Sequence, residues 1–278
     1  MTAKPIKSIG IRGILFSIAI CAIFAVLVSS AAVLLKPRQM DNQRLYQIRN
    51  ILIVSGIADE NSSSDPDSAF RLYQTHVEQK FIDLKSAAYV EAPENADQYD
   101  MMAEAKTPEG GYDAPKNSAG VKRLPKIAQV YIVYDENHAV SSLILPIVGS
   151  GLWSTIYGYL ALNADGQTIR GVTFYSHGET PGLGGEIDNP RWKEQWKGKQ
   201  MFDEDGKPAF HIARGRANNE DHFTIDGISG ATLTSQGVSG MVQFWLGPDA
   251  FGPFIHQFAA AHHIQMAAQA FQKVEVMP

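Results

Sequence analysis

Residues 128–175 read AQVYIVYDENHAVSSLILPIVGSGLWSTIYGYLALNADGQTIRGVTFY, and this stretch decides the class of fold. Its runs of β-branched and aromatic residues predict β-strands at 128–134, 139–148, 157–164 and 168–175. Asp165-Gly166, between the last two runs, is a strong hairpin signal. Because helical patterns lie on either side of these strands, the sequence predicts an α+β domain with an antiparallel sheet flanked by helices.

Composition excludes several kinds of protein. The chain has 278 residues, 45% of them hydrophobic, which is enough for a packed core and argues against a disordered chain. Its single cysteine excludes a disulfide framework, a zinc cluster and a protein-ligated iron–sulfur centre. The 24 basic and 29 acidic residues give a net charge of −5, so we expect no nucleic-acid partner.

An uncharged apolar segment near the start, residues 13–35, predicts a transmembrane helix in contact with membrane lipid. Its length of about 23 residues is enough to cross a hydrocarbon layer of about 30 Å. The alternative is a cleaved signal peptide with a site at Ser30-Ala31-Ala32, but the apolar core of such a signal usually has only about 7–15 residues. Basic residues are nearly balanced across the span, with Lys4, Lys7 and Arg12 before it and Lys36, Arg38, Arg44 and Arg49 after it. Charge therefore does not decide the orientation, and we expect residues 1–12 to form a short cytoplasmic tail because so short a tail most simply stays inside.

The chain between this span and the sheet is expected to be a juxtamembrane helical region with a long loop, residues 36–126. Apolar spacing predicts helices over 42–54 and 69–84. Residues 91–123, rich in acidic residues, Pro, Gly and Asn, predict a surface loop. A compact domain is then expected at 127–255.

Helical patterns also follow the sheet. They predict a short helix at 190–199, a longer one at 229–246 and a helical tail at 256–278. The tail contains His256, His262 and His263, but no carboxylate or cysteine lies at metal-ligand spacing from them, so we expect no metal site.

The segment before the longer helix, 226–235, reads DGISGATLTS and has the composition of a phosphate-binding helix start. Ser229 is a favourable N-cap residue, and Gly230 and Ala231 allow a ligand to approach the backbone closely. Free N–H groups and the positive end of the helix dipole favour a phosphate there. An ordinary capped helix explains the same residues.

Two glycine-rich segments adjoin the strands. HGETPGLGGE, residues 177–186, follows the last strand and fits a loop that wraps a planar ligand, although it matches neither a Walker loop nor a dinucleotide fingerprint. GSGLW, residues 149–153, ends in Trp153, whose indole can stack on an aromatic ring system or simply pack in the core.

Together these three segments identify a family resemblance. With the N-terminal span, the spaced Asn189-Pro190-Arg191-Trp192 and the closing FWLG and GPF, they resemble the C subunits of the sodium-translocating NADH:quinone oxidoreductases, members of a wider group of covalent-FMN domains. The resemblance covers the span and residues 127–254, is weak over 59–123 and is absent after 254. Its motifs are also partly shared by G subunits of the related ferredoxin-linked complex, which is one alternative. An anchored binding module that never carries flavin is another.

The resemblance implies that one FMN is joined by a phosphoester bond to Thr232, attached by a separate flavin transferase. Thr234 is a second hydroxyl, two residues on, that stays open as the acceptor. The surrounding motif maps onto Asp226, Ser229, Gly230, Ala231 and Leu233.

The resemblance also places the 177–186 loop against the flavin ring. Glu179, Thr180, Leu183 and Gly184 map to this loop, and Trp153 to a neighbouring aromatic. Hydrogen bonds between the polar edge of the ring and the side chains of Glu179 and Thr180 would tune its potential. A solvated loop charge and a satisfied turn residue are the competing interpretations of these two side chains.

As a member of this family the chain would relay electrons and would not complete a reaction alone. The resemblance implies partner subunits of the A, B, D, E and F types in a membrane complex of six subunits. In it, electrons pass from NADH through other subunits to this FMN, then to a second covalent FMN and on to ubiquinone, coupled to sodium export. It also implies a single-pass protein of the bacterial inner membrane with the flavin domain on the periplasmic side. No residue is predicted to be catalytic.

Overall fold

The computed structural model describes residues 10–59, 63, 65–94, 96–218 and 220–262. By its internal contacts the chain divides into two units, Met1–Gln47 and Ile48–Pro278. Residues 1–9 of the expected cytoplasmic tail at 1–12, and residues 263–278 of the expected helical tail with His263, lie outside the described residues.

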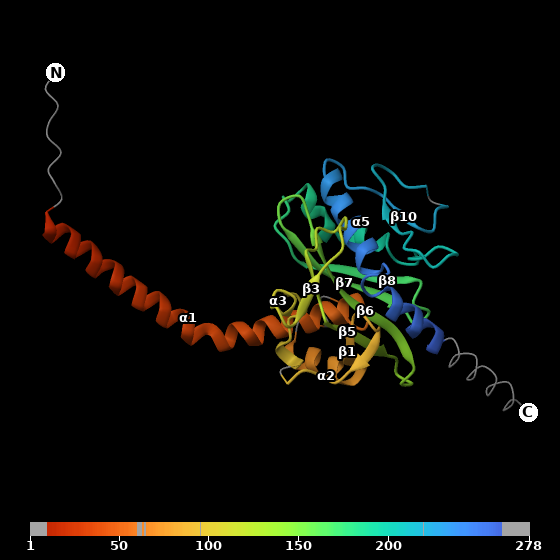
Figure 1. The fold of residues 1–278 in the computed structure, drawn as a ribbon, viewed down its shortest axis with the longest axis horizontal. Coiled ribbons are helices and arrows are strands. Elements are labelled where there is room, and N and C mark those ends of the chain that lie inside the picture. Colours follow the sequence, from red (N-terminus) through yellow and green to blue (C-terminus); the bar gives the residue numbers. More distant parts are fainter. Residues whose placement is uncertain (1–9, 60–62, 64, 95, 219, 263–278) are drawn as a thin grey trace, which may run out of the picture. The chain divides into compact units, whose positions relative to one another are not determined.

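The first unit consists of most of helix α1, Ile11–Val54 (Figure 1). Within the described residues, one helix is long and apolar enough to span a membrane. It is Gly13–Val54, whose apolar window has a mean hydropathy of 2.8 and no buried residue. The structure thus confirms an apolar N-terminal helix, and the predicted helix at 42–54 is its continuation beyond Pro37.

The second unit is built on a six-stranded sheet with the order β2-β1-β5-β6-β7-β8, in which every neighbouring pair is antiparallel. The strands are β1 Val77–Asp83, β2 Ala88–Val90, β5 Ile127–Tyr134, β6 Val140–Ser150, β7 Thr155–Asn163 and β8 Ile169–Ser176. The four strands predicted from sequence are β5 to β8. The antiparallel α+β fold is therefore confirmed.

The predicted hairpin between β7 and β8 turns at Asp165-Gly166. Gly166 has a φ of +66°, which glycine adopts without steric cost, and its N–H donates to the carbonyl of Asn163. The Asp165 carboxylate accepts hydrogen bonds from the backbone of Gln167 and Thr168, which fixes the turn.

Two predictions upstream of β5 are wrong. The helix expected over 69–84 ends with α2, Pro66–His76, and the chain continues as β1. Since β1 pairs with β5 along its whole length, sheet hydrogen bonding overrides the helical spacing of its apolar residues. The loop expected over 91–123 contains four short elements, η1 Ala96–Gln98, α3 Met101–Glu104, β3 Gly111–Asp113 and β4 Arg123–Pro125. This segment is held in place by contacts with residues that are distant in the sequence. One of them is the hydrogen bond from Tyr99 Oη to the carbonyl of Ile127.

One face of the sheet is covered by α5, Thr232–Trp245, which realises the longer predicted helix (Figure 1). Trp245 Nε1 donates to the carbonyl of Val148 at 2.6 Å. At Gly149 the helix comes so close that an added Cβ would lie 2.6 Å from the Cβ of Met241. The close approach fixes the second half of α5 relative to the end of β6.

Smaller elements complete the second unit. The short helix expected at 190–199 is α4, Pro190–Glu194, preceded by η2, Gly184–Asp188. Strands β9, His211–Ile212, and β10, Thr224–Ile225, form a parallel pair. Residues 252–262 are helical, as expected for the first part of the tail.

The last turns of α1, which belong to the second unit, pack on the opposite face of the sheet. Ile51 and Leu52 are buried. Asn50 Oδ1 accepts a hydrogen bond from Thr173 Oγ1 at 3.1 Å. Thr173 lies between two β8 residues that face the α5 side, so it points to the other side of the sheet.

Candidate functional site

Helix α5 begins without a side-chain cap. Its N-cap residue is Ala231, not the predicted Ser229, and no side chain hydrogen-bonds at the cap. Ser229 is exposed on the preceding turn, where Gly230 has a φ of +74°. The backbone N–H groups of the first helical turn and the helix dipole therefore favour an anion at this end.

Asp226 holds the turn before α5 in place. Its carboxylate accepts a hydrogen bond from the backbone of Ala217 at 2.7 Å, and its carbonyl accepts one from Trp192 Nε1 at 2.8 Å. The loop tied down in this way also carries Arg214 and Arg216, both exposed. Asp226 thus anchors the motif to its neighbours.

The two threonines of the motif have opposite surroundings. Thr232 is the first residue of α5 and is exposed. Thr234 is fully buried, and its hydroxyl donates to Glu179 Oε2 at 2.6 Å. Of the two hydroxyls, the one at Thr232 is open to a ligand and to a modifying enzyme.

Glu179 is buried, with 5% of its surface exposed, so it is not a solvated loop charge. Its Oε1 accepts a hydrogen bond from the backbone of Trp153 at 2.9 Å, while Oε2 accepts the one from Thr234. The carboxylate therefore links the loop after β8, the loop after β6 and the first turn of α5. We call this set of contacts the Glu179 brace.

The hydrogen bonds of the brace keep Glu179 ionised. Burial by itself raises the pKa of this carboxyl group. The hydrogen bond from Thr234 and the backbone N–H groups of Trp153, Leu152 and Ser154 outweigh that effect, so the pKa of Glu179 lies below its usual value.

The rest of the 177–186 loop folds into a tight turn. The carbonyl of Thr180 accepts hydrogen bonds from the backbone of Leu183 and Gly185. The side chains of Thr180 and Leu183 are exposed, whereas Gly184 is buried against Thr234. The turn thus presents one hydroxyl and one apolar side chain on the surface.

Four exposed apolar side chains lie on the three segments that the Glu179 brace joins. They are Leu152, Trp153, Leu183 and Leu233, and Trp153 is 71% exposed. Among the described residues of the second unit, Tyr89 is the one other large hydrophobic residue that is exposed. We call these four residues the apolar collar. An apolar surface beside an anion-favouring helix start fits a planar ligand that carries a phosphate, such as FMN.

Sequence reasoning brought together most of these residues but missed two. Leu152 belongs to the collar, and Ser154 Oγ accepts a hydrogen bond from the backbone of Gly178 that joins the two glycine-rich loops. An apolar residue beside Trp153 in a polar, glycine-rich turn was the available signal for Leu152. The Ser154 contact has no sequence signal, because its partner lies 24 residues away.

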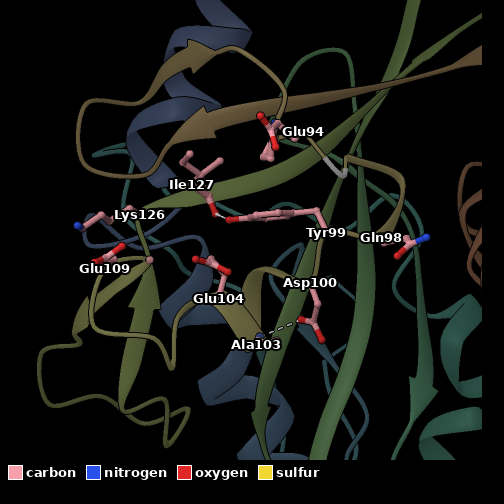
Figure 2. A pocket seen from close by; sticks show the side chains of 11 residues that line it. Glu94, Gln98, Tyr99, Asp100, Ala103, Glu104, Glu109, Lys126 and Ile127 are labelled. Carbon is pink, nitrogen blue, oxygen red and sulfur yellow. Dashed lines mark hydrogen bonds between the residues drawn. The ribbon is translucent and has the colours of Figure 1, made fainter.

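A cavity of about 550 Å³ lies elsewhere in the second unit and has a different lining. Figure 2 shows the carboxyl groups of Glu94, Asp100, Glu104 and Glu109 around the ring of Tyr99. We call it the acidic cavity. None of the predicted site residues lines it, and its carboxylates disfavour a ligand that carries a phosphate.

These features define the class of the second unit, an FMN-binding domain. Residues 151–247 match the family model described as the FMN-binding domain. The matched segment contains Trp153, the 177–186 loop and all of α5.

Relatives narrow this class to one family. The C subunit of the Na(+)-translocating NADH-quinone reductase of Yersinia pestis is 40% identical over 254 residues, which are 89% of this chain and 92% of that relative. The C subunit from Pseudomonas aeruginosa is 39% identical over 249 residues, 88% of this chain and 94% of that relative. The crystal structure of Shewanella oneidensis NqrC is 33% identical in sequence and superposes with a TM-score of 0.73. The match covers 79% of this chain and 99% of the NqrC chain. The chain belongs to the family of C subunits of the Na(+)-translocating NADH-quinone reductase.

Proposed function

We propose that this chain is an electron-carrying subunit whose single FMN is joined by a phosphoester bond to Thr232. The observation that carries the proposal is the contrast between the two threonines, since Thr232 is exposed at an uncapped helix start while Thr234 is buried and donates to Glu179. The membership of the chain in the C-subunit family supports the cofactor and the role.

The residues of the site have distinct tasks in this proposal. The first-turn N–H groups of α5 bind phosphate oxygens, and the exposed Arg214 and Arg216 offset their charge. Leu183, Leu233 and Trp153 cover apolar ring surface and exclude water from it. Thr180 presents a hydroxyl that can hydrogen-bond to the polar edge of the ring. FMN, when bound, supplies reversible electron transfer, and the protein supplies its position and electrostatic surroundings.

The wider role follows from the family. The relatives are named as subunits of a Na(+)-translocating NADH-quinone reductase. We propose that this chain works with subunits of the A, B, D, E and F types, that it passes electrons derived from NADH toward ubiquinone, and that this transfer is coupled to sodium export. α1 would anchor the chain once in a bacterial inner membrane, with the flavin domain on the periplasmic side.

Peptide mass mapping tests the cofactor and its attachment together. The full chain is produced with a flavin transferase, denatured, precipitated and digested. We expect flavin fluorescence to remain with the denatured protein, and the peptide that contains Thr232 to be heavier by one FMN phosphoester. Protein without flavin under these conditions would contradict the proposal and favour an anchored binding module.

A further inference from the structure

We propose that Glu179 is a positioning residue, which sets the geometry of the FMN site through Trp153 and Thr234 instead of contacting the flavin. This inference rests on the proposed function, because it concerns how the attachment site at Thr232 is held. It also replaces the expectation that Glu179 hydrogen-bonds to the polar edge of the ring.

Both oxygens of the Glu179 carboxylate accept hydrogen bonds from the protein. Glu179 Oε1 accepts from the Trp153 backbone at 2.9 Å and Oε2 from Thr234 Oγ1 at 2.6 Å. Each oxygen is therefore already paired with a protein donor inside the fold. Bonds of this kind to an ionised acceptor are shorter and stronger than those between neutral groups.

The Glu179 carboxylate is also closely packed by the backbone of two loops. A Cβ added to Gly184 would lie 2.6 Å from Thr234 Oγ1 and 2.7 Å from Glu179 Oε2, and one added to Gly151 would also overlap the carboxylate. Glycines on both loops thus let the backbone close around Glu179. Because this space is already filled, the carboxylate faces the protein and not the surface where the collar lies.

The brace also separates the roles of the two threonines. The Thr234 hydroxyl uses its proton in the hydrogen bond to Glu179 and is buried, so it is closed to a phosphoester. Thr232 lies two residues earlier on the same helix, about 200° away around its axis, and faces out. Holding Thr234 inward therefore holds Thr232 outward, beside the collar.

Exchange of the Trp153 backbone N–H measures the brace in flavin-free protein. Glu179→Ala removes the acceptor, and we expect the Trp153 amide to exchange about tenfold faster, the effect of losing one hydrogen bond to a charged group. Glu179→Gln keeps one acceptor oxygen but loses the charge, so we expect exchange at a rate between those of the parent chain and Glu179→Ala. Equal exchange in the parent chain and Glu179→Ala would overturn the inference.

Visible circular dichroism of the bound flavin measures the consequence for the site. In full-length protein made with a flavin transferase, we expect Thr234→Val to keep covalent FMN at Thr232 but to lose about half of the flavin signal per cofactor, because the collar and the helix start are no longer held together. Thr234→Ser restores the hydroxyl and should restore the signal. A merely structural hydroxyl would change stability and leave the flavin signal unchanged, and that result would overturn the inference.

The two proposals fail in different ways. If the parent chain carries no covalent FMN, the proposed function fails, while amide exchange still decides whether the brace exists. If peptide mapping of the parent chain finds FMN on Thr234 and not on Thr232, then Thr234 is the acceptor, and the inference about the brace is wrong.

Discussion

The apolar collar and the acidic cavity are both features of the second unit to which a ligand could be assigned, and they differ in chemistry more than in shape. The acidic cavity has a volume of about 550 Å³ but is lined by four carboxyl groups, with Lys126 as the one cation among its lining residues. The collar is an open surface, yet it joins exposed apolar side chains to an uncapped helix start and an exposed hydroxyl. In this chain the chemistry of the surface, and not the size of a hollow, carries the proposal for the cofactor site.

The largest effect is expected from removing the Thr232 hydroxyl while its surroundings are kept. Thr232→Ala should abolish covalent flavin while the fold is retained, because the substitution trims a few atoms from an exposed position. In-gel flavin fluorescence of protein made with a flavin transferase measures this, and far-ultraviolet circular dichroism controls for folding. Retained flavin in Thr232→Ala, with loss in Thr234→Ala, would move the acceptor to Thr234.

Overpacking at Gly184 tests whether the collar depends on the buried contacts beneath it. Gly184→Ala should lower the free energy of unfolding by about 1–3 kcal/mol, because the added methyl group overlaps Thr234 and Glu179. Gly215→Ala is the matched control, since no atom lies within 4 Å of its added Cβ, and it should change stability by less than about 0.5 kcal/mol. Denaturant unfolding measures both variants, and equal values would show that Gly184 is not tightly packed.

A smaller effect should appear in the pH dependence of stability. The pKa of Glu179 is lower in the folded chain than its usual value, so its ionised form stabilises the fold. This contribution is fully present above the usual glutamate pKa and is lost as the pH falls through the lower folded value. The difference in unfolding free energy between the parent chain and Glu179→Gln should therefore shrink on acidification below about pH 4.5. A difference that stays constant would mean that Glu179 is not ionised in the fold.

The smallest effect is expected in the acidic cavity. Glu94→Gln combined with Glu109→Gln removes two exposed charges there, and we expect covalent flavin content to stay unchanged and stability to shift by less than about 0.5 kcal/mol. The same mass mapping and denaturant unfolding measure these quantities. Loss of flavin in this double variant would connect the cavity with the cofactor site and break the contrast between the two regions.

The local sequence pattern was sufficient to predict most of the sheet and the helix that position the site. Strands β5 to β8, the Asp165-Gly166 turn and α5 were predicted because their periodicity and turn chemistry are properties of neighbouring residues. β1 was mistaken for helix because its identity depends on pairing with β5, about fifty residues away.

The site itself was predicted only in part. The family resemblance grouped Trp153, Glu179 and the threonines and pointed to Thr232 as the acceptor, but it left Thr234 open. Helix geometry alone places residues two apart on different sides, and burial then determines which side faces in. That Glu179 faces inward could not be predicted, because it depends on how closely the glycines of two loops approach.

The spacing of the brace along the chain bears on when the site is assembled. Its contacts join residues 26 and 55 positions apart, across β7 and β8 and then across the segment that leads to α5. Contacts this distant in sequence form only after the intervening chain has closed into its native topology. Thr232, the proposed attachment residue, is therefore presented in its final setting late in folding, and a transferase that requires that setting would load finished domains and pass over nascent ones.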